Sequence, residues 1–184
     1  MSKNQKDNLL NLEEIEKLAK QYEDSEIYTL KTVNQDIKFN PYFSRTKIRE
    51  IMEEFQRYMQ SEDEADKKYM KHVTSSDQNT ILFWYFLAVK KFTSIGDELN
   101  RKRKVKSLFP YYKAILETGI LEEIINDVFI YSELQKINSM FATEAGTMVA
   151  AEDFMSKYDE VLEKRREEFK EHIKTEVKWF NAYF

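Results

Sequence analysis

The 184-residue sequence carries 34% charged residues and a formal net charge of −4, with only three glycines, two prolines and no cysteine. The lack of cysteine excludes disulfide frameworks, thiol nucleophiles and thiolate metal sites. The mild acidic charge argues against attraction of the whole protein to nucleic acid or to an anionic membrane. Because turn-rich β-sandwiches and barrels need many more glycines and prolines, we expect a mainly α fold.

The chain length suits one well-packed domain. We expect residues 1–10 to form a flexible N-terminus and residues 11–184 to form a single mainly helical domain. The N-terminus has no apolar segment of signal-peptide length. The longest apolar run, Ile81–Val89, has nine residues, whereas a membrane helix needs about 20. These features predict a cytoplasmic protein.

The first predicted elements are a helix at 11–23, with Asn11 as its N-cap, and a small β-hairpin at 26–39. The segment EIYTLKTVNQDIKF is rich in β-branched and aromatic residues, and Asn34, Gln35 and Asp36 interrupt it. A lone two-stranded hairpin is marginal in water. We therefore expect this hairpin either to pack on the helices or to offer an edge to a partner.

An amphipathic helix is predicted next, at 45–59, because Ser44 can cap it and its apolar residues recur at intervals of three and four. These residues are Ile48, Ile51, Met52, Phe55 and Met59. Ser61 to Glu64 has the spacing of a capping box, which predicts a second, charged helix starting there. The polar run 74–79 is predicted to be a loop.

The apolar run from Thr80 predicts a central helix that forms the core of the bundle. A short helix at 107–119, stopped by Gly119, should follow, and then a helix at about 120–141. A terminal helix at 151–184 is predicted last; docking on the same chain is the simpler interpretation, and the alternatives are that it projects from the domain or docks on a partner. The predicted fold class is thus a multi-helix bundle with one small β-hairpin near the N-terminus.

No pattern in the sequence points to an enzyme. His72 and His172 have no neighbour at metal-ligand spacing, and the three glycines stand alone, so neither a metal motif nor a phosphate loop is present. Paired carboxylates such as Glu53 and Glu54 face different directions on a helix and are typical of a solvated surface. We expect no catalytic residue, no metal and no cofactor.

Two clusters are candidate binding sites. Five cations within six positions could grip phosphates, although a solvated turn that balances nearby acidic segments is the simpler interpretation; these are Arg101, Lys102, Arg103, Lys104 and Lys106. Four aromatic residues crowd the last six positions and should be covered either by the protein's own core or by a partner; these are Trp179, Phe180, Tyr183 and Phe184.

The order of residues 26–59, a strand pair followed by an aromatic link and the helix start SRTKIREIMEEF, resembles the opening of tail assembly chaperones of tailed bacteriophages. The resemblance covers about a fifth of the chain. It implies a non-enzymatic protein that binds tape-measure or tail subunits in several copies in the bacterial host cell. The implied contact surfaces are the hairpin edge, with Ile27, Tyr28, Leu30, Ile37 and Phe39, and the exposed part of helix 45–59.

Two hypotheses from different classes therefore stand. The first is a protein-interaction module of phage type, such as a tail assembly chaperone or another virion assembly protein, which could be a homo-oligomer. The second is a nucleic-acid-binding regulator that uses the basic cluster at residues 101–106. Steep weakening of binding with rising salt would be the signature of the second.

Overall fold

The computed structural model describes residues 11–144 together with Lys178. The predicted terminal helix at 151–184, its four aromatic residues, His172 and the predicted flexible segment 1–10 lie outside this description, apart from Lys178. Within it the fold is mainly helical with a two-stranded antiparallel hairpin near the N-terminus, which confirms the predicted fold class. The elements are α1 (Leu12–Lys20), β1 (Glu26–Leu30), β2 (Gln35–Phe39), α2 (Arg45–Met59), α3 (Glu64–Val73), α4 (Asp77–Phe92), α5 (Gly96–Leu99), α6 (Val105–Glu117), α7 (Ile120–Glu123), η2 (Ile124–Val128) and α8 (Tyr131–Glu144).

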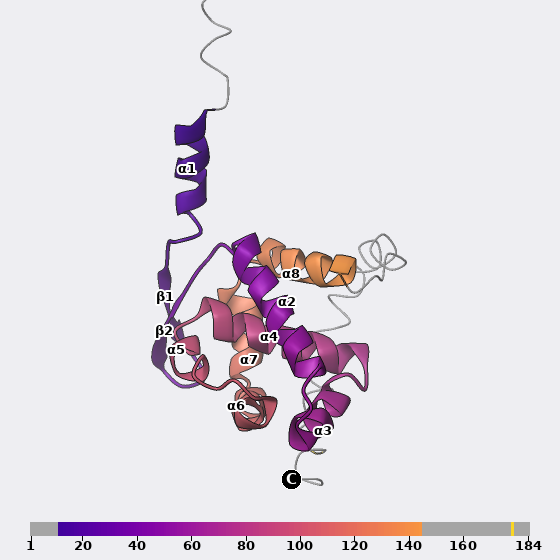
Figure 1. Cartoon of the computed structure of the whole chain (residues 1–184). Helices are drawn as coiled ribbons and strands as arrows, with labels where there is room; N and C mark the ends of the chain where they lie inside the picture. Colours follow the sequence, from indigo (N-terminus) through magenta and orange to yellow (C-terminus); the bar gives the residue numbers. More distant parts are fainter. Residues whose placement is uncertain (1–10, 145–177, 179–184) are drawn as a thin grey trace, which may run out of the picture.

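Helix α4 is the centre of the body, as its apolar sequence predicts, and contacts α2, α3, α5 and α7. Phe83, Phe86 and Phe92 are all but fully buried on it. Around this helix, α2 also contacts α3 and α8, while α3 contacts α6. Figure 1 shows the hairpin at the margin of this body and α1 extending away from it. No helix in the described part of the chain has the length and apolar character needed to span a membrane.

The start of α2 is the best example of a local signal that the structure confirms. Ser44 has an extended backbone, and its side chain accepts a hydrogen bond from the Lys47 N–H at 3.2 Å. Most of the stripe predicted from the spacing packs inward, since Ile48, Ile51 and Met52 are buried and Phe55 is half-buried, but Met59 at its end is 49% exposed. Helix α2 is therefore built as the sequence indicates.

Two predicted helix starts are wrong by a few residues. The N-cap of α3 is Asp63, which accepts a hydrogen bond from Ala65 N–H, whereas Ser61 Oγ lies 3.1 Å from the carboxylate of the buried Asp66. Helix α4 begins at Asp77 under a Ser76 cap, inside the predicted loop. Its polar first turn resembles a loop in sequence, but Asn79 is buried and donates to the carbonyl of His72.

The single helix predicted at about 120–141 is also wrong, because the chain breaks between η2 and α8. Phe129 adopts an extended backbone with ψ of 136°. Its buried ring lies edge-on to Phe43, with ring centroids 4.9 Å apart, and Phe43 in turn stacks on Phe92. The break between η2 and α8 thus places the ring of Phe129 in the core.

Glycine is required at two turns. A Cβ on Gly96 would lie 1.8 Å from the carbonyl oxygen of Lys90, so α5 can turn this closely against the end of α4 only without a side chain. Gly119 has a φ of 75°, in the left-handed region that favours glycine, and ends α6 as predicted.

Candidate functional site

The hairpin is fastened to the body along β2. The Asn40 N–H donates to the Phe92 carbonyl at 2.8 Å, and the Ser94 N–H donates to the Lys38 carbonyl at 2.7 Å. The Lys38 N–H donates to the Ser94 hydroxyl at 3.1 Å. These bonds extend the hairpin onto the segment that follows α4, with Phe39 opposite Thr93. The outer edge of β2 is therefore covered.

The loop of the hairpin is held by Glu123 of α7. The carboxylate of this buried residue accepts hydrogen bonds from the Lys31 N–H at 2.5 Å, the Thr32 N–H at 3.0 Å and the Thr32 hydroxyl at 2.5 Å. Burial acts to raise the pKa of Glu123, but these three bonds outweigh it and hold the pKa below its usual range. Lys31 also pairs with Asp127 at 2.9 Å. The turn is fixed to the body at this point.

The outer edge of β1, in contrast, is open. Ile27 lies opposite Lys38 in the antiparallel register, and the backbone of Lys38 bonds away from β1. Since backbone groups alternate between the two edges of an antiparallel strand, Ile27 and Thr29 direct their N–H and C=O groups outward. The side chain of Ile27 is 72% exposed. Within the described residues, no backbone partner covers this edge.

The structure separates the five hairpin residues that the sequence proposes as contacts. Leu30, Ile37 and Phe39 are buried and Tyr28 is half-buried, because they form the face of the hairpin that packs on the helices. Only Ile27 among them is exposed. The exposed remainder of α2 is partly used as well, since Glu50 pairs with Lys91 and the buried Lys90 with Glu54 at 2.5 Å.

Helix α1 forms a surface that sequence reasoning missed. Its capping box is complete, with Asn11 and Glu14 each bonded to the backbone of the other, yet none of its residues is buried. Leu12, Ile15 and Leu18 are 77%, 45% and 61% exposed. The spacing of these residues predicts the helix and could have marked the stripe, but spacing alone does not show that the stripe is left uncovered by the described part of the chain.

The segment between α1 and β1 is tied to the body by two contacts. The amide of Asn40 donates to the Asp24 carbonyl at 2.7 Å. The ammonium group of Lys136 lies 5.7 Å from the centroid of the Tyr22 ring, and Lys136 itself is bound by the buried carboxylate of Glu133 at 2.7 Å. Helix α1 therefore leaves the body from an anchored base (Figure 1), and the side chains of its apolar stripe are exposed.

The basic cluster is largely occupied by contacts within the chain. Lys104 and Lys106 pair with Asp63 at 3.2 and 2.7 Å, and the Lys106 N–H donates to the buried Asp66 at 2.8 Å. The ammonium group of Lys102 lies 5.6 Å from the Tyr111 ring centroid. Arg101 and Arg103 are exposed. The cluster thus fastens the start of α6 to α3, which reduces the positive charge offered to a phosphate backbone.

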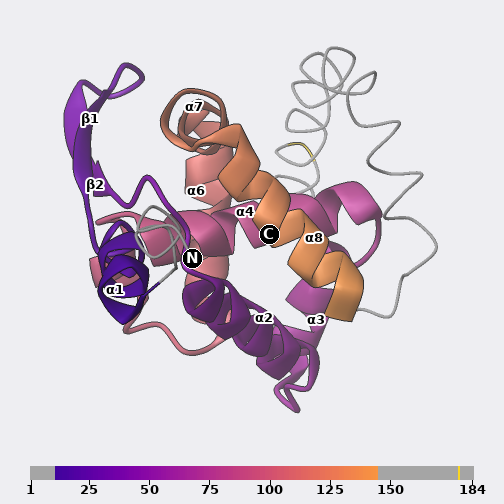
Figure 2. The ribbon, with the colours of Figure 1, turned by 90° about the horizontal axis from the view of Figure 1, so that it is seen from above.

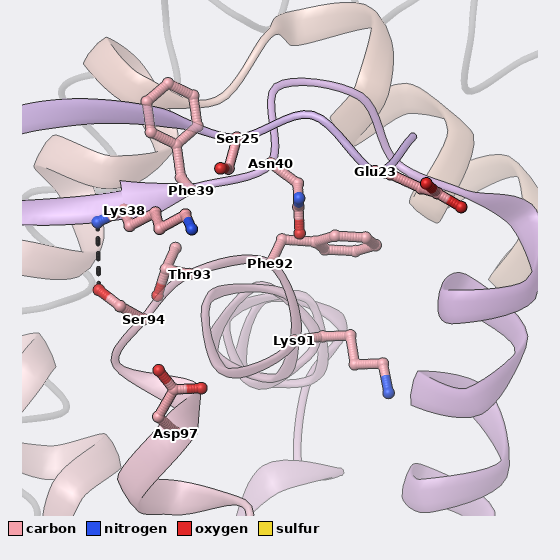
Figure 3. Close-up of a pocket in the computed structure, with 10 residues that line it drawn as sticks. All are labelled: Glu23, Ser25, Lys38, Phe39, Asn40, Lys91, Phe92, Thr93, Ser94 and Asp97. Carbon is pink, nitrogen blue, oxygen red and sulfur yellow. Dashed lines mark hydrogen bonds between the residues drawn. The ribbon is translucent and has the colours of Figure 1, made fainter. Parts of the chain in front are cut away.

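A pocket of about 280 Å³ lies beneath the seam between β2 and the segment after α4 (Figure 3). Its lining includes Lys38, Asn40, Lys91, Ser94 and Asp97. Lys91 is paired with Glu50, and the amide of Asn40 holds the Asp24 carbonyl. The dashed contact in Figure 3 is the bond that joins Lys38 to Ser94. We interpret the pocket as part of the attachment of the hairpin.

A salt bridge between the buried Lys90 and the half-buried Glu54 also joins α2 to α4. Glu54 accepts hydrogen bonds from the ammonium group of Lys90 and from the Tyr58 hydroxyl. Burial raises the pKa of Tyr58 well above its usual range, and the neighbouring Glu54 carboxylate raises it further.

His72 is buried, with its ring edge-on to that of Phe109. Among the described residues, no three His, Asp or Glu side chains gather where they could hold a metal ion.

A protein-family model, YomO, matches residues 12–181. This range spans α1, the hairpin and the helical body. Neither the curated proteins nor the solved structures contain a significant match. YomO is the name of a phage-derived family of the Bacillus SPbeta type, and it does not point to tail assembly. This chain belongs to the YomO family.

Proposed function

We propose that this chain is a non-enzymatic interaction protein of a phage, and that α1 binds a helical segment of a protein partner during virion assembly. The observation that carries the proposal is the apolar stripe Leu12, Ile15 and Leu18, which is exposed on a capped helix with an anchored base. An exposed stripe of this kind marks an interaction surface more often than an isolated apolar residue does.

A helical partner suits the geometry of α1. Leu12, Ile15 and Leu18 recur at intervals of three, so they lie on one side of α1, as the apolar residues do in an amphipathic helix that pairs with another helix or fills a groove. Glu13, Glu14 and Glu16 flank the stripe near its start. A partner that presents apolar residues beside basic ones would complement both features.

The specific form of this proposal is a tail assembly chaperone that binds tape-measure or tail subunits. Membership of a phage-derived family and the hairpin-then-helix order of residues 26–59 support it. The partner would then be a virion component, and binding would not require the basic cluster.

The test is co-purification of the tagged full-length chain from phage-producing cells, followed by mass spectrometry. A triple variant, Leu12→Glu, Ile15→Glu and Leu18→Glu, should keep the thermal midpoint of the wild type, because none of these residues is buried, and should lose the virion proteins. The matched control changes Glu13, Lys17 and Lys20 to glutamine, which leaves the stripe intact. Recovery of the same virion proteins by the triple variant, or of nucleic-acid enzymes alone by the wild type, would refute the proposal.

A further inference from the structure

We propose that two copies of this chain pair through the outer edges of their β1 strands and form a four-stranded antiparallel sheet about a two-fold axis at Tyr28. The open edge of β1 carries this inference. It does not rest on the proposed function, because the stripe of α1 takes no part in the pairing.

The edge is self-complementary in its backbone. The N–H and C=O groups of Ile27 and Thr29 face outward, while those of Tyr28 face β2. When two such edges meet antiparallel with Tyr28 opposite its own copy, Ile27 of each strand faces Thr29 of the other. Those two residues can then exchange both of their backbone hydrogen bonds. One symmetric register therefore satisfies the four outward groups of each strand.

The strand lacks the features that normally prevent such pairing. Edge strands are commonly protected by lysine, proline or a bulge, but β1 reads EIYTL and pairs in regular register with β2. On its solvent face, Ile27 is 72% exposed and the Thr29 hydroxyl is turned back to Asp36 at 2.6 Å. In the symmetric pair, Ile27 would be covered by Thr29 of the other copy.

The edge is also rigid, so little conformational entropy would be lost when a second strand adds to it. Bonds to Phe92 and Ser94 hold β2, and Glu123 holds the loop. In both ribbon views the hairpin lies at the margin of the helical body, with the helices on one side of it (Figures 1 and 2).

Charges at the ends of the strand favour a second copy as the occupant. In the register centred on Tyr28, Ser25 lies opposite Lys31 of the other copy, and Asp24 and Glu26 flank that position. Lys31 remains 74% exposed beside Asp127. Each end of the paired strands would therefore bring an acidic segment next to a lysine, and a parallel pairing would lose this match.

The first test is the mass of the full-length protein in solution, measured by sedimentation over a series of concentrations. We expect a concentration-dependent approach to twice the monomer mass of 22.2 kDa. Ile27→Pro should return the mass to that of the monomer, because it removes an outward N–H without removing a bond of the hairpin. Ile27→Thr keeps the N–H and the β-branch and is the control.

The second test uses the absence of cysteine from the natural sequence. In Tyr28→Cys the two new thiols would face each other at a narrow, non-hydrogen-bonded pair, so mild oxidation should give a covalent dimer on a non-reducing gel. Lys38→Cys, on the covered strand, should stay monomeric under the same conditions.

A wild type that stays monomeric at every concentration would overturn the proposal, as would a dimer that persists unchanged in Ile27→Pro. If the edge instead binds a strand of another protein, the purified wild type would stay monomeric. The triple glutamate variant of α1 should dimerise like the wild type, so failure of the dimer and failure of partner binding are distinguishable.

Discussion

Helices α1 and α2 begin in the same way and end up in opposite environments. Each has a polar N-cap, Asn11 or Ser44, whose side chain accepts a hydrogen bond from the third residue of the helix. Each carries an apolar stripe. Yet α2 buries Ile48, Ile51, Met52 and Tyr58, whereas α1 buries nothing. Capping and periodicity therefore determine that a helix forms, and they leave open which surface covers its apolar face.

The buried ion pair between α2 and α4 should give the largest effect on stability. Lys90→Met leaves the carboxylate of Glu54, which is only 15% exposed, without its cation, and removing one partner of a buried pair costs about 3–5 kcal/mol of unfolding free energy. Urea denaturation measures this loss. The double variant Lys90→Met with Glu54→Leu should recover most of it, and a double variant as unstable as the single one would contradict this account.

The contrast between the stripes can be tested with isoleucines. Ile48→Ala, at a position that is 0% exposed, should lower the unfolding free energy by about 2–5 kcal/mol. Ile15→Ala, at a position that is 45% exposed, should change it by less than about 0.5 kcal/mol. Equal losses in the two variants would show that α1 is packed on the body in solution.

Removal of the two N-caps should show the same contrast, with a larger loss of unfolding free energy for Ser44 than for Asn11. Ser44→Ala should cost about 1 kcal/mol, because α2 is coupled to the cooperative unfolding of the core. Asn11→Ala should fray α1 and leave the global transition almost unchanged. Amide hydrogen exchange separates the effects, since protection should fall in residues 12–20 alone for the second variant.

The smallest effect expected concerns pH and the contact between α3 and α6. Hydrogen bonds from Lys106 and Lys104 hold the pKa of Asp63 well below its usual value of 3.8. A carboxyl whose pKa is lowered in the folded state stabilises the fold fully at pH values above its unfolded-state pKa. This contribution is lost as the pH falls from there toward the lowered, folded-state pKa. The thermal midpoint of Asp63→Asn, which keeps a capping oxygen, should therefore fall less steeply between pH 5 and about 2 than that of the wild type. Added salt should reduce the difference, because the ion pairs are partly exposed.

Much of the fold could be predicted from local pattern, as the hairpin, the Ser44 cap and the central helix show. The errors have a common origin in contacts between distant residues. Phe129 breaks a helical pattern to reach Phe43, and Asp66 is buried because it binds the backbone of Lys106. Such contacts join segments far apart in sequence, and no local window contains them.

The candidate site shows the same division. The β-branched and aromatic residues of 26–39 determined that these segments are strands, and both Ile27 and Leu30 were predicted contacts. Only the tertiary structure decided that Leu30 is buried at 2% exposure while Ile27 is exposed at 72%. It also decided which edge of the hairpin is open. The physical reason is that side-chain pattern governs local conformation, whereas burial and edge pairing depend on which distant surfaces the folded chain brings against each strand.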